Sequence, residues 1–134
     1  MNKHILYVED DLDSCELIQV WLGFHGYEVQ SVHRAVEAAL LAKASSYSLF
    51  ILDNWLPDGD GVELCKQIHA GDSAAAIIFL SGAAYPHDID QALTAGAQAY
   101  FTKPVDLSEL LCTVSQLVGG QDKETLASVA RAKQ

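Results

Sequence analysis

Residues 48–61 read SLFILDNWLPDGDG. The apolar run LFIL at residues 49–52 has the composition of a strand buried in a protein interior, yet it stops at a carboxylate, Asp53. Aspartate is a common turn residue because its side chain can hydrogen-bond nearby backbone amides. The alternative is that a sheet presents this carboxylate to a ligand, and the residues that end the other strands decide between the two interpretations.

Segments with strand character alternate along the chain with segments whose apolar residues have helical spacing. Strands are expected at residues 4–9, 27–32, 48–52, 76–80 and 97–101, and helices at residues 12–24, 35–44, 62–70, 88–95 and from Asp106 onward. Apolar strands separated by helices of about ten residues predict a parallel sheet with helices on both faces. The expected fold class is therefore α/β, a doubly wound five-stranded parallel sheet.

Length and composition describe one ordinary globular domain. The chain has 134 residues, of which 50% are hydrophobic and 19% are charged. No apolar stretch approaches the roughly 20 residues of a membrane span, and the acidic start does not resemble a signal peptide. The three cysteines are odd in number and form no CxxC motif, so we expect buried side chains in a reducing cytosol. A net charge of −10 argues against binding to a nucleic-acid backbone. We expect a cytoplasmic protein without a direct nucleic-acid or membrane partner.

Ligands of doubly wound sheets bind beyond the carboxyl ends of the strands, so the residues that follow each strand are informative. The first strand is followed by acids, the third by an acid, the fourth by a hydroxyl and the fifth by a lysine: Glu9, Asp10 and Asp11, then Asp53, Ser81 and Lys103. Each has an ordinary explanation by itself, such as acids that favour the dipole of the following helix, a surface lysine or a turn. Their convergence at one end of one sheet favours a binding site.

The chemistry of this set is consistent with phosphoryl transfer. Closely packed carboxylates repel one another unless a cation neutralises them, and an all-oxygen site with two or three carboxylates suits Mg²⁺. Lys103 would balance a phosphoryl group, the Ser81 hydroxyl can donate to a phosphoryl oxygen, and Asp53 is a candidate nucleophile.

Four motifs that occur in order, ILYVEDD, LFILDNWLPDGDG, FLSG and AYFTKP, resemble the receiver domain of two-component response regulators. The resemblance covers about residues 3–118 and implies a (βα)5 flavodoxin-like fold with strand order 2-1-3-4-5. It implies that Asp53 is the phosphoacceptor. It also implies an Mg²⁺ site formed by Glu9, Asp10, Asp53 and the backbone carbonyl of Trp55.

The same resemblance assigns the remaining positions. Ser81 and Lys103 are expected to contact the phosphoryl group, and Ser81 and Tyr100 to form the switch. The Lys103-Pro104 peptide bond is expected to be cis. The implied partners are a histidine kinase or a histidine phosphotransfer protein, and a downstream protein target or output domain. A homodimer is compatible with the sequence, and the chain would be a signalling phosphoacceptor, not an enzyme.

Three alternatives remain open. An Mg²⁺-dependent aspartyl-phosphate hydrolase of the haloacid-dehalogenase type would want a second acid two residues after its nucleophile, where Trp55 stands. A flavin-binding flavodoxin would want a Ser/Thr/Gly-rich phosphate loop after the first strand, where this chain is acidic. A pseudo-receiver that serves only as an interaction module would not need the site residues, all of which are retained.

The loop after Asp53 departs from the pattern of the family, and the C-terminal segment lies beyond it. Gly59 replaces a common large apolar residue, which predicts a looser loop after Asp53, and Asn54 and Trp55 are unusual neighbours of the acceptor. We expect a receiver domain at residues 1–118. Residues 119–134 are expected to form a polar C-terminal tail or linker.

Overall fold

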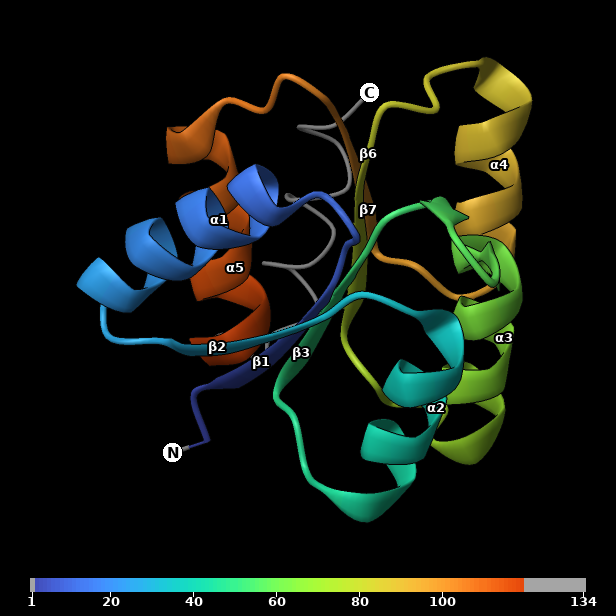
Figure 1. Cartoon of the computed structure of the whole chain (residues 1–134), viewed down its shortest axis with the longest axis horizontal. Helices are drawn as coiled ribbons and strands as arrows, with labels where there is room; N and C mark the ends of the chain where they lie inside the picture. The colour runs from blue at the N-terminus through green and yellow to red at the C-terminus, as the bar shows by residue number, and fades with distance from the viewer. Residues whose placement is uncertain (1, 120–134) are drawn as a thin grey trace.

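Five parallel strands form the central sheet of the protein, in the spatial order β2-β1-β3-β6-β7 (Figure 1). They are β1 (His4–Val8), β2 (Glu28–Val32), β3 (Leu49–Leu52), β6 (Ile77–Ser81) and β7 (Ala99–Thr102). Counting only the strands of this sheet, the order is 2-1-3-4-5, so the predicted topology is confirmed. The computed structural model describes residues 2–119. Residues 120–134, and with them nearly all of the predicted tail, lie outside the described residues.

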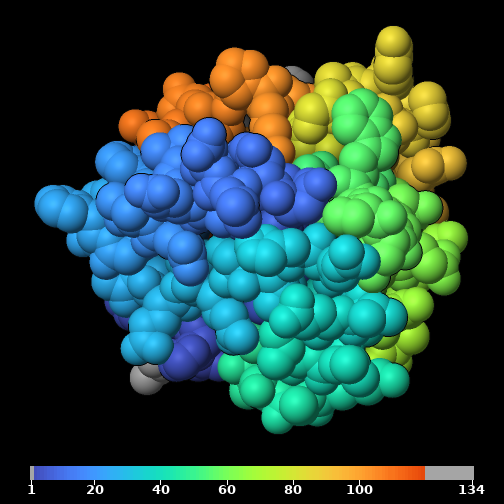
Figure 2. Space-filling model, in the orientation of Figure 1, coloured from blue at the N-terminus to red at the C-terminus, as the bar shows by residue number. Residues whose placement is uncertain are grey.

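Helices cover both faces of this sheet, as a doubly wound fold requires (Figure 1). One face carries α1 (Leu12–Phe24) and α5 (Leu107–Gly119), and the other carries α2 (Ala35–Ala44), α3 (Gly61–Gly71) and α4 (Pro86–Thr94). The predicted fold class is therefore confirmed. In the space-filling view these helices and their loops hide most of the strands (Figure 2).

The hydrophobic core has two layers, one on each side of the sheet. Alternate residues of a strand point to opposite faces, so Leu6 and Val8 pack toward α2 and α3, whereas Ile5 and Tyr7 pack toward α1 and α5. Because both faces are buried, the strands read as continuous apolar runs without polar alternation. Because the strands are parallel, the residues that follow them lie at the same rim of the sheet.

Helix bounds agree with the predicted ranges to within two residues, and local capping explains the starts. Asp106 lies just before α5, where its Oδ1 accepts hydrogen bonds from the backbone amides of Ser108 and Glu109 at 2.9 and 3.1 Å. The fourth helix begins at Pro86, two residues earlier than predicted. Proline is favourable in a first helical turn because the amide hydrogen it lacks would have no partner there.

A short hairpin after Asp53 was not predicted. It consists of β4 (Trp55–Leu56) and β5 (Gly59–Asp60), which pair antiparallel. At its turn, the carboxylate of Asp58 accepts hydrogen bonds from the backbone amides of Ala35 and Val36 at 2.7 and 3.0 Å. The segment that was expected to be a looser loop because of Gly59 is thus paired with itself and is fastened to the start of α2.

The cysteines only partly follow the prediction of burial. Cys15 and Cys65 are buried, and burial raises the pKa of the Cys65 thiol to about 11. Cys112 is exposed, because Leu110 and Thr113 take the buried positions beside it on α5. Over residues 2–119, every helix is too short or too polar to cross a membrane.

Candidate functional site

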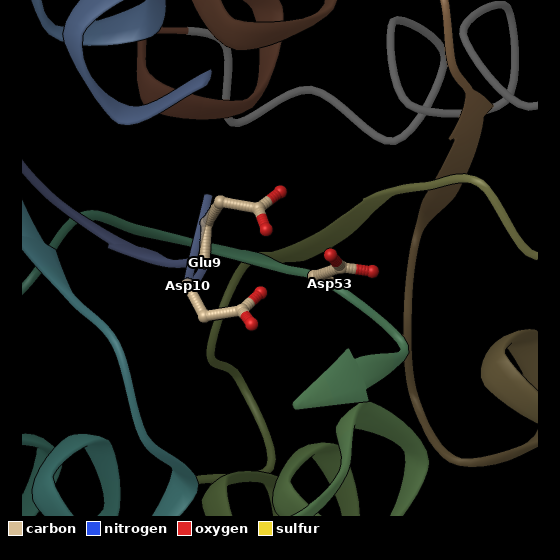
Figure 3. Close-up of side chains that lie close together, drawn as sticks. All are labelled: Glu9, Asp10 and Asp53. Atoms are coloured by element: carbon tan, nitrogen blue, oxygen red, sulfur yellow. The ribbon is translucent and has the colours of Figure 1, made fainter. Parts of the chain in front are cut away.

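Three carboxylates meet at the carboxyl ends of β1 and β3. The backbone amide of Asp53 donates to the carbonyl of Val8 at 3.0 Å, which sets Asp53 beside the residue after β1. Glu9, Asp10 and Asp53 each offer one carboxylate oxygen, and these three oxygens lie within 4.8 Å of one another. Figure 3 shows the three carboxyl groups turned to the same side of the strand ends. The structure thus brings together the three acidic side chains expected at the metal.

The neighbouring acid, Asp11, does not join this cluster. Its Oδ2 accepts hydrogen bonds from the Ser14 backbone amide at 3.1 Å and from the Ser14 hydroxyl at 2.5 Å, so Asp11 is the N-cap of α1. These bonds hold the pKa of Asp11 below its usual range. Of the three consecutive acids, Asp11 is thus the one whose place at the helix N-terminus explains it without a ligand.

Glu9 is held in place by partners at both of its carboxylate oxygens. The Tyr7 hydroxyl donates to Oε1 and the backbone amide of Asp11 donates to Oε2, each over 3.2 Å. Lys103 Nζ also contacts Oε1. Tyr7 was not expected at the site, although it lies two residues before Glu9 and so points to the same side of the strand. Burial and the nearby Glu9 raise the pKa of the Tyr7 hydroxyl, so it remains a donor.

Burial governs the electrostatics of Glu9 and Lys103. Glu9 is only 1% exposed, and burial raises its pKa to about 7 even though the contact with Lys103 opposes the rise. Burial alone would lower the pKa of Lys103, but its hydrogen bond with Glu9 and the charge of Asp53 outweigh this, so the net shift is upward. Lys103 therefore stays charged and only partly compensates the carboxylates.

Asp53 faces the hydroxyl and the lysine that the sequence placed on the same rim. Its Oδ1 accepts hydrogen bonds from the Ser81 hydroxyl at 2.7 Å and from the Trp55 backbone amide at 3.2 Å. Its Oδ2 lies 3.5 Å from Lys103 Nζ. The backbone amide of Lys103 donates to the Ser81 carbonyl at 3.0 Å, which aligns the ends of β6 and β7. The peptide bond between Lys103 and Pro104 is cis.

Tyr100 lies close behind this site, on β7. Its ring stacks on Phe79 with a centroid distance of 5.4 Å and an interplanar angle of 6°, and its hydroxyl donates to the Ala83 carbonyl at 2.5 Å. Asn54 Nδ2 donates to the same hydroxyl at 3.5 Å. Ser81 and Tyr100 therefore share the neighbours Asn54 and Ala83. Sequence reasoning singled out Asn54 only as an unusual neighbour of Asp53, because a contact with a distant strand leaves no local pattern.

Trp55 lies at the outer edge of the site. Trp55 is 62% exposed. A Cβ placed on Gly82 would lie 3.7 Å from Cζ3 of the indole, so the ring rests beside the turn after β6. Gly61, at the start of α3, lies behind Asp53, where a Cβ would be 2.9 Å from the Phe79 ring and closer still to the Asp53 carbonyl oxygen. The role expected of the Trp55 carbonyl in metal binding stays a prediction.

The donor set suits a hard divalent cation. Carboxylate oxygens are the ligands that Mg²⁺ prefers, whereas a zinc site would draw on cysteine or histidine ligands. The three carboxylates are close enough to share one ion, and a bound cation would relieve the cost of keeping Glu9 ionised in a buried position. The residues present therefore fit Mg²⁺.

Comparison with known proteins points to one family. Residues 5–115 match the family model of the response regulator receiver domain. The uncharacterized transcriptional regulatory protein YkoG of Bacillus subtilis is 34% identical over 111 residues, which are 83% of this chain and 49% of YkoG. The response regulator MprA of Mycobacterium tuberculosis is 32% identical over 118 residues, which are 88% of this chain and 51% of MprA. The chain thus spans about half the length of these curated relatives.

Solved structures agree with the sequence comparison. A CheY-like response regulator receiver domain protein from Methanospirillum hungatei superposes with a TM-score of 0.86 at 32% identity, over 92% of this chain and 99% of that protein. The receiver domain of a sensor histidine kinase from Pseudomonas aeruginosa gives a TM-score of 0.81 at 29% identity, over 89% of this chain and 99% of that domain. That structure has a magnesium ion coordinated in its active site cleft.

Proposed function

From the fact that this chain belongs to the response regulator receiver family, we propose that Asp53 accepts a phosphoryl group from a phosphohistidine of a partner protein. The observation that carries the proposal is the convergence around Asp53. Two further carboxylates, the Ser81 hydroxyl and the Lys103 ammonium group all reach the rim where this side chain stands. A site built only for structure would have no reason to gather three carboxylates around one partly buried lysine.

The residues around Asp53 would position the transfer. An oxygen of Asp53 attacks phosphorus as the bond from phosphorus to the donor imidazole nitrogen breaks, which leaves an acyl phosphate on Asp53 and a free histidine on the donor. Oδ2 is the better-placed oxygen because Oδ1 already accepts from Ser81 and Trp55. Lys103, 3.5 Å from Oδ2, would neutralise charge on the phosphoryl group.

Glu9, Asp10 and Asp53, together with the Trp55 carbonyl, would hold Mg²⁺. When bound, the ion would supply positive charge to the phosphoryl oxygens during transfer. The closely spaced carboxylates support this assignment, and so does the magnesium ion in the related Pseudomonas aeruginosa domain. Tyr7 and Lys103 orient Glu9 for this role.

The phosphoryl group would then act as a signal. The Ser81 hydroxyl, which donates to Asp53 in this structure, would then donate to a phosphoryl oxygen, and Ser81 shares the neighbour Asn54 with Tyr100. We propose that phosphorylation acts through Ser81 and Tyr100 to shift an equilibrium between two conformations of the domain. The domain would comprise residues 1–118 and would act in the cytoplasm. The donor would be a histidine kinase or a histidine phosphotransfer protein. The signal would pass to a downstream protein or output domain. This chain would act either as a monomer or as a homodimer.

Two alternative functions, a hydrolase and a pseudo-receiver, have less support. A hydrolase of the haloacid-dehalogenase type would need an acid at position 55, where the structure has an exposed indole. A pseudo-receiver would have no use for the acceptor, the acids, the hydroxyl and the lysine together.

The proposal is tested by incubating the protein with acetyl phosphate, with and without Mg²⁺, and measuring the intact mass. We expect one added phosphoryl group that depends on Mg²⁺ and is lost in Asp53→Asn. Asp11→Asn is the matched control, because this acid lies on the same rim but caps α1. Circular dichroism would establish that both variants are folded. Stoichiometric labelling of Asp53→Asn would place the nucleophile elsewhere and overturn the proposal.

A further inference from the structure

Asn54 is bound to both halves of the proposed switch. It directly follows the acceptor and is only 6% exposed. Its backbone amide donates to Ser81 Oγ at 3.3 Å, and its side-chain Nδ2 donates to the Tyr100 hydroxyl at 3.5 Å. Its carbonyl accepts from the Gly61 amide at 2.9 Å, which anchors the residue on α3. A phosphoryl group that moves Ser81 therefore acts on a residue that also touches Tyr100.

The Tyr100 hydroxyl uses both its donor and its acceptor capacity inside the protein. It donates to the Ala83 carbonyl and accepts from Asn54, while the ring stacks on Phe79. Each of these contacts favours the buried position that the Tyr100 ring occupies in this structure, which we call the inward position. The bond from Asn54 is the longer of the two, so a small displacement of the ring is enough to break it.

We propose that Asn54 is a positioning residue that couples the acceptor site to Tyr100, by holding the Tyr100 ring inward before phosphorylation. The inference rests on the proposed function, because it takes Ser81 and Tyr100 as the switch. Asn54 would act through the Tyr100 hydroxyl and not on the phosphoryl group itself. An apolar side chain of similar size could fill the same space but could not hold the ring.

This coupling has a measurable consequence for affinity. A ligand that needs the inward ring binds with an apparent affinity proportional to the fraction of protein already in that state. The amide of Asn54 raises this fraction without any ligand. Its removal should therefore weaken the binding of a phosphoryl mimic, although the amide donates to Tyr100 and not to the site that the mimic would occupy.

A double-mutant cycle separates this role from simple packing. The variants are Asn54→Leu, Tyr100→Phe and the two combined, since Phe keeps the stack on Phe79 and loses only the hydroxyl. Asn54→Ala replaces Asn54→Leu if the larger side chain prevents folding. The matched control is Thr113→Val combined with Tyr100→Phe, because Thr113 is also buried and polar but lies on α5, across the sheet.

The first readout needs no metal and no mimic. Urea unfolding of the four proteins of the cycle should show that the double variant is more stable than the sum of the single effects predicts. We expect a departure of at least about twofold in the unfolding equilibrium constant. The Thr113 cycle should be additive. Additivity of the Asn54 cycle would show that the two side chains do not interact and would overturn the inference.

The second readout is titration with beryllofluoride and Mg²⁺, followed by amide chemical shifts. Asn54→Leu should weaken the apparent affinity by about three- to tenfold with Tyr100 present, and by much less with Phe at position 100. Equal weakening in both backgrounds would mean that Asn54 acts directly on the acceptor, which contradicts the inference. If the parent protein does not bind the mimic at all, the proposed function fails, and the unfolding cycle still decides whether Asn54 holds Tyr100.

Discussion

The Ser81 hydroxyl donates a hydrogen bond to Asp53 Oδ1 over 2.7 Å, which joins the ends of two neighbouring strands. Ser81 Oγ also accepts a hydrogen bond from the Ala83 amide at 3.2 Å, in the turn that leads to α4. A phosphoryl group that draws this hydroxyl away from Asp53 must therefore disturb the turn after β6. The acceptor and a surface helix are thus connected through a single side chain.

Ser81→Ala should weaken the transmission of the signal while leaving the acceptor in place. In the parent protein, beryllofluoride with Mg²⁺ should move amide chemical shifts at residues 82–95 and 97–107. In the variant these distant shifts should fall to less than about half, because no hydroxyl follows the phosphoryl mimic. Ser48→Ala is the control, since its hydroxyl donates to the His4 carbonyl at the opposite end of the sheet. Shifts confined to the acidic loops in the parent protein would count against the switch.

Trp55→Asn should shorten the lifetime of the phosphorylated protein. The indole rests beside the turn after β6. It offers one N–H donor and much apolar bulk, so we expect it to shield Asp53 more than it orients water. An asparagine can hold an attacking water, and we expect loss of phosphate to become about three- to tenfold faster. Intact mass measured over time gives the rate. Phe24→Ser, at an exposed aromatic at the end of α1, should leave it unchanged. An unchanged or slower rate in Trp55→Asn would mean that the indole does not shield the site.

Glu9 should make the metal-free protein less stable as the pH rises. Its pKa is about 7 in the folded protein and near its ordinary value of 4.5 in the unfolded chain. Between these values the folded protein binds more protons than the unfolded chain, so stability falls as the pH increases through this window. In EDTA, Tm should decrease between about pH 4.5 and 7, and Glu9→Gln should flatten that decrease.

A control and an added ion sharpen this pH experiment. Glu16→Gln, on the exposed side of α1, should keep the slope of the parent protein. Added Mg²⁺ should restore Tm above pH 7 in the parent more than in Glu9→Gln, because the ion binds the ionised carboxylate. The same slope in Glu9→Gln and in the parent protein would show that another group is responsible.

Two glycines of α3 provide a matched pair for stability. Gly61→Ala should destabilise the fold by about 1–3 kcal/mol, because the added methyl group overlaps the Asp53 carbonyl and the Phe79 ring. Gly71→Ala, in the same helix, meets no atom within 4 Å and should stabilise it by about 0.5 kcal/mol. Urea unfolding measures both. Equal effects of the two changes would show that space behind the acceptor is not limiting.

The fold was predictable because both faces of the sheet are buried. Five apolar runs separated by helical segments leave few arrangements other than a parallel sheet between two layers of helices. The order of the strands came from the resemblance to a family, since periodicity alone does not say which strands are neighbours. The site followed from the same logic, because whatever ends a parallel strand lies on one rim.

The three consecutive acids after β1 show where this reasoning stops. Composition could not separate Asp10, which joins the cluster, from Asp11, which caps α1. The helix start was predicted correctly at residue 12, but the direction of each side chain before it depends on backbone angles that composition does not specify.

Tyr7 and Asn54 were missed for a different reason. A tyrosine in an apolar run reads as core, and its hydroxyl gains a role only because the neighbouring Glu9 is also buried. Asn54 donates a hydrogen bond to Tyr100, which lies 46 residues further along the chain, and no local pattern predicts such a contact. The hairpin after Asp53 has strands of two residues, which are too short for any periodicity to predict.

The capping of α2 by Asp58 means that two surface segments should open together. Arg34, the N-cap residue of α2, makes no side-chain capping bond among the residues that the structure describes. The first turn of this helix instead depends on a carboxylate that lies 23 residues further along the chain, in the hairpin that carries Trp55. We expect the amide hydrogens of Ala35 and Val36 to exchange with water when the hairpin detaches, so that the hairpin and the start of α2 behave as one cooperative unit of hydrogen exchange. A destabilising change on the outer surface of α2 should therefore also speed hydrogen exchange in the hairpin after Asp53, without touching any residue of the site.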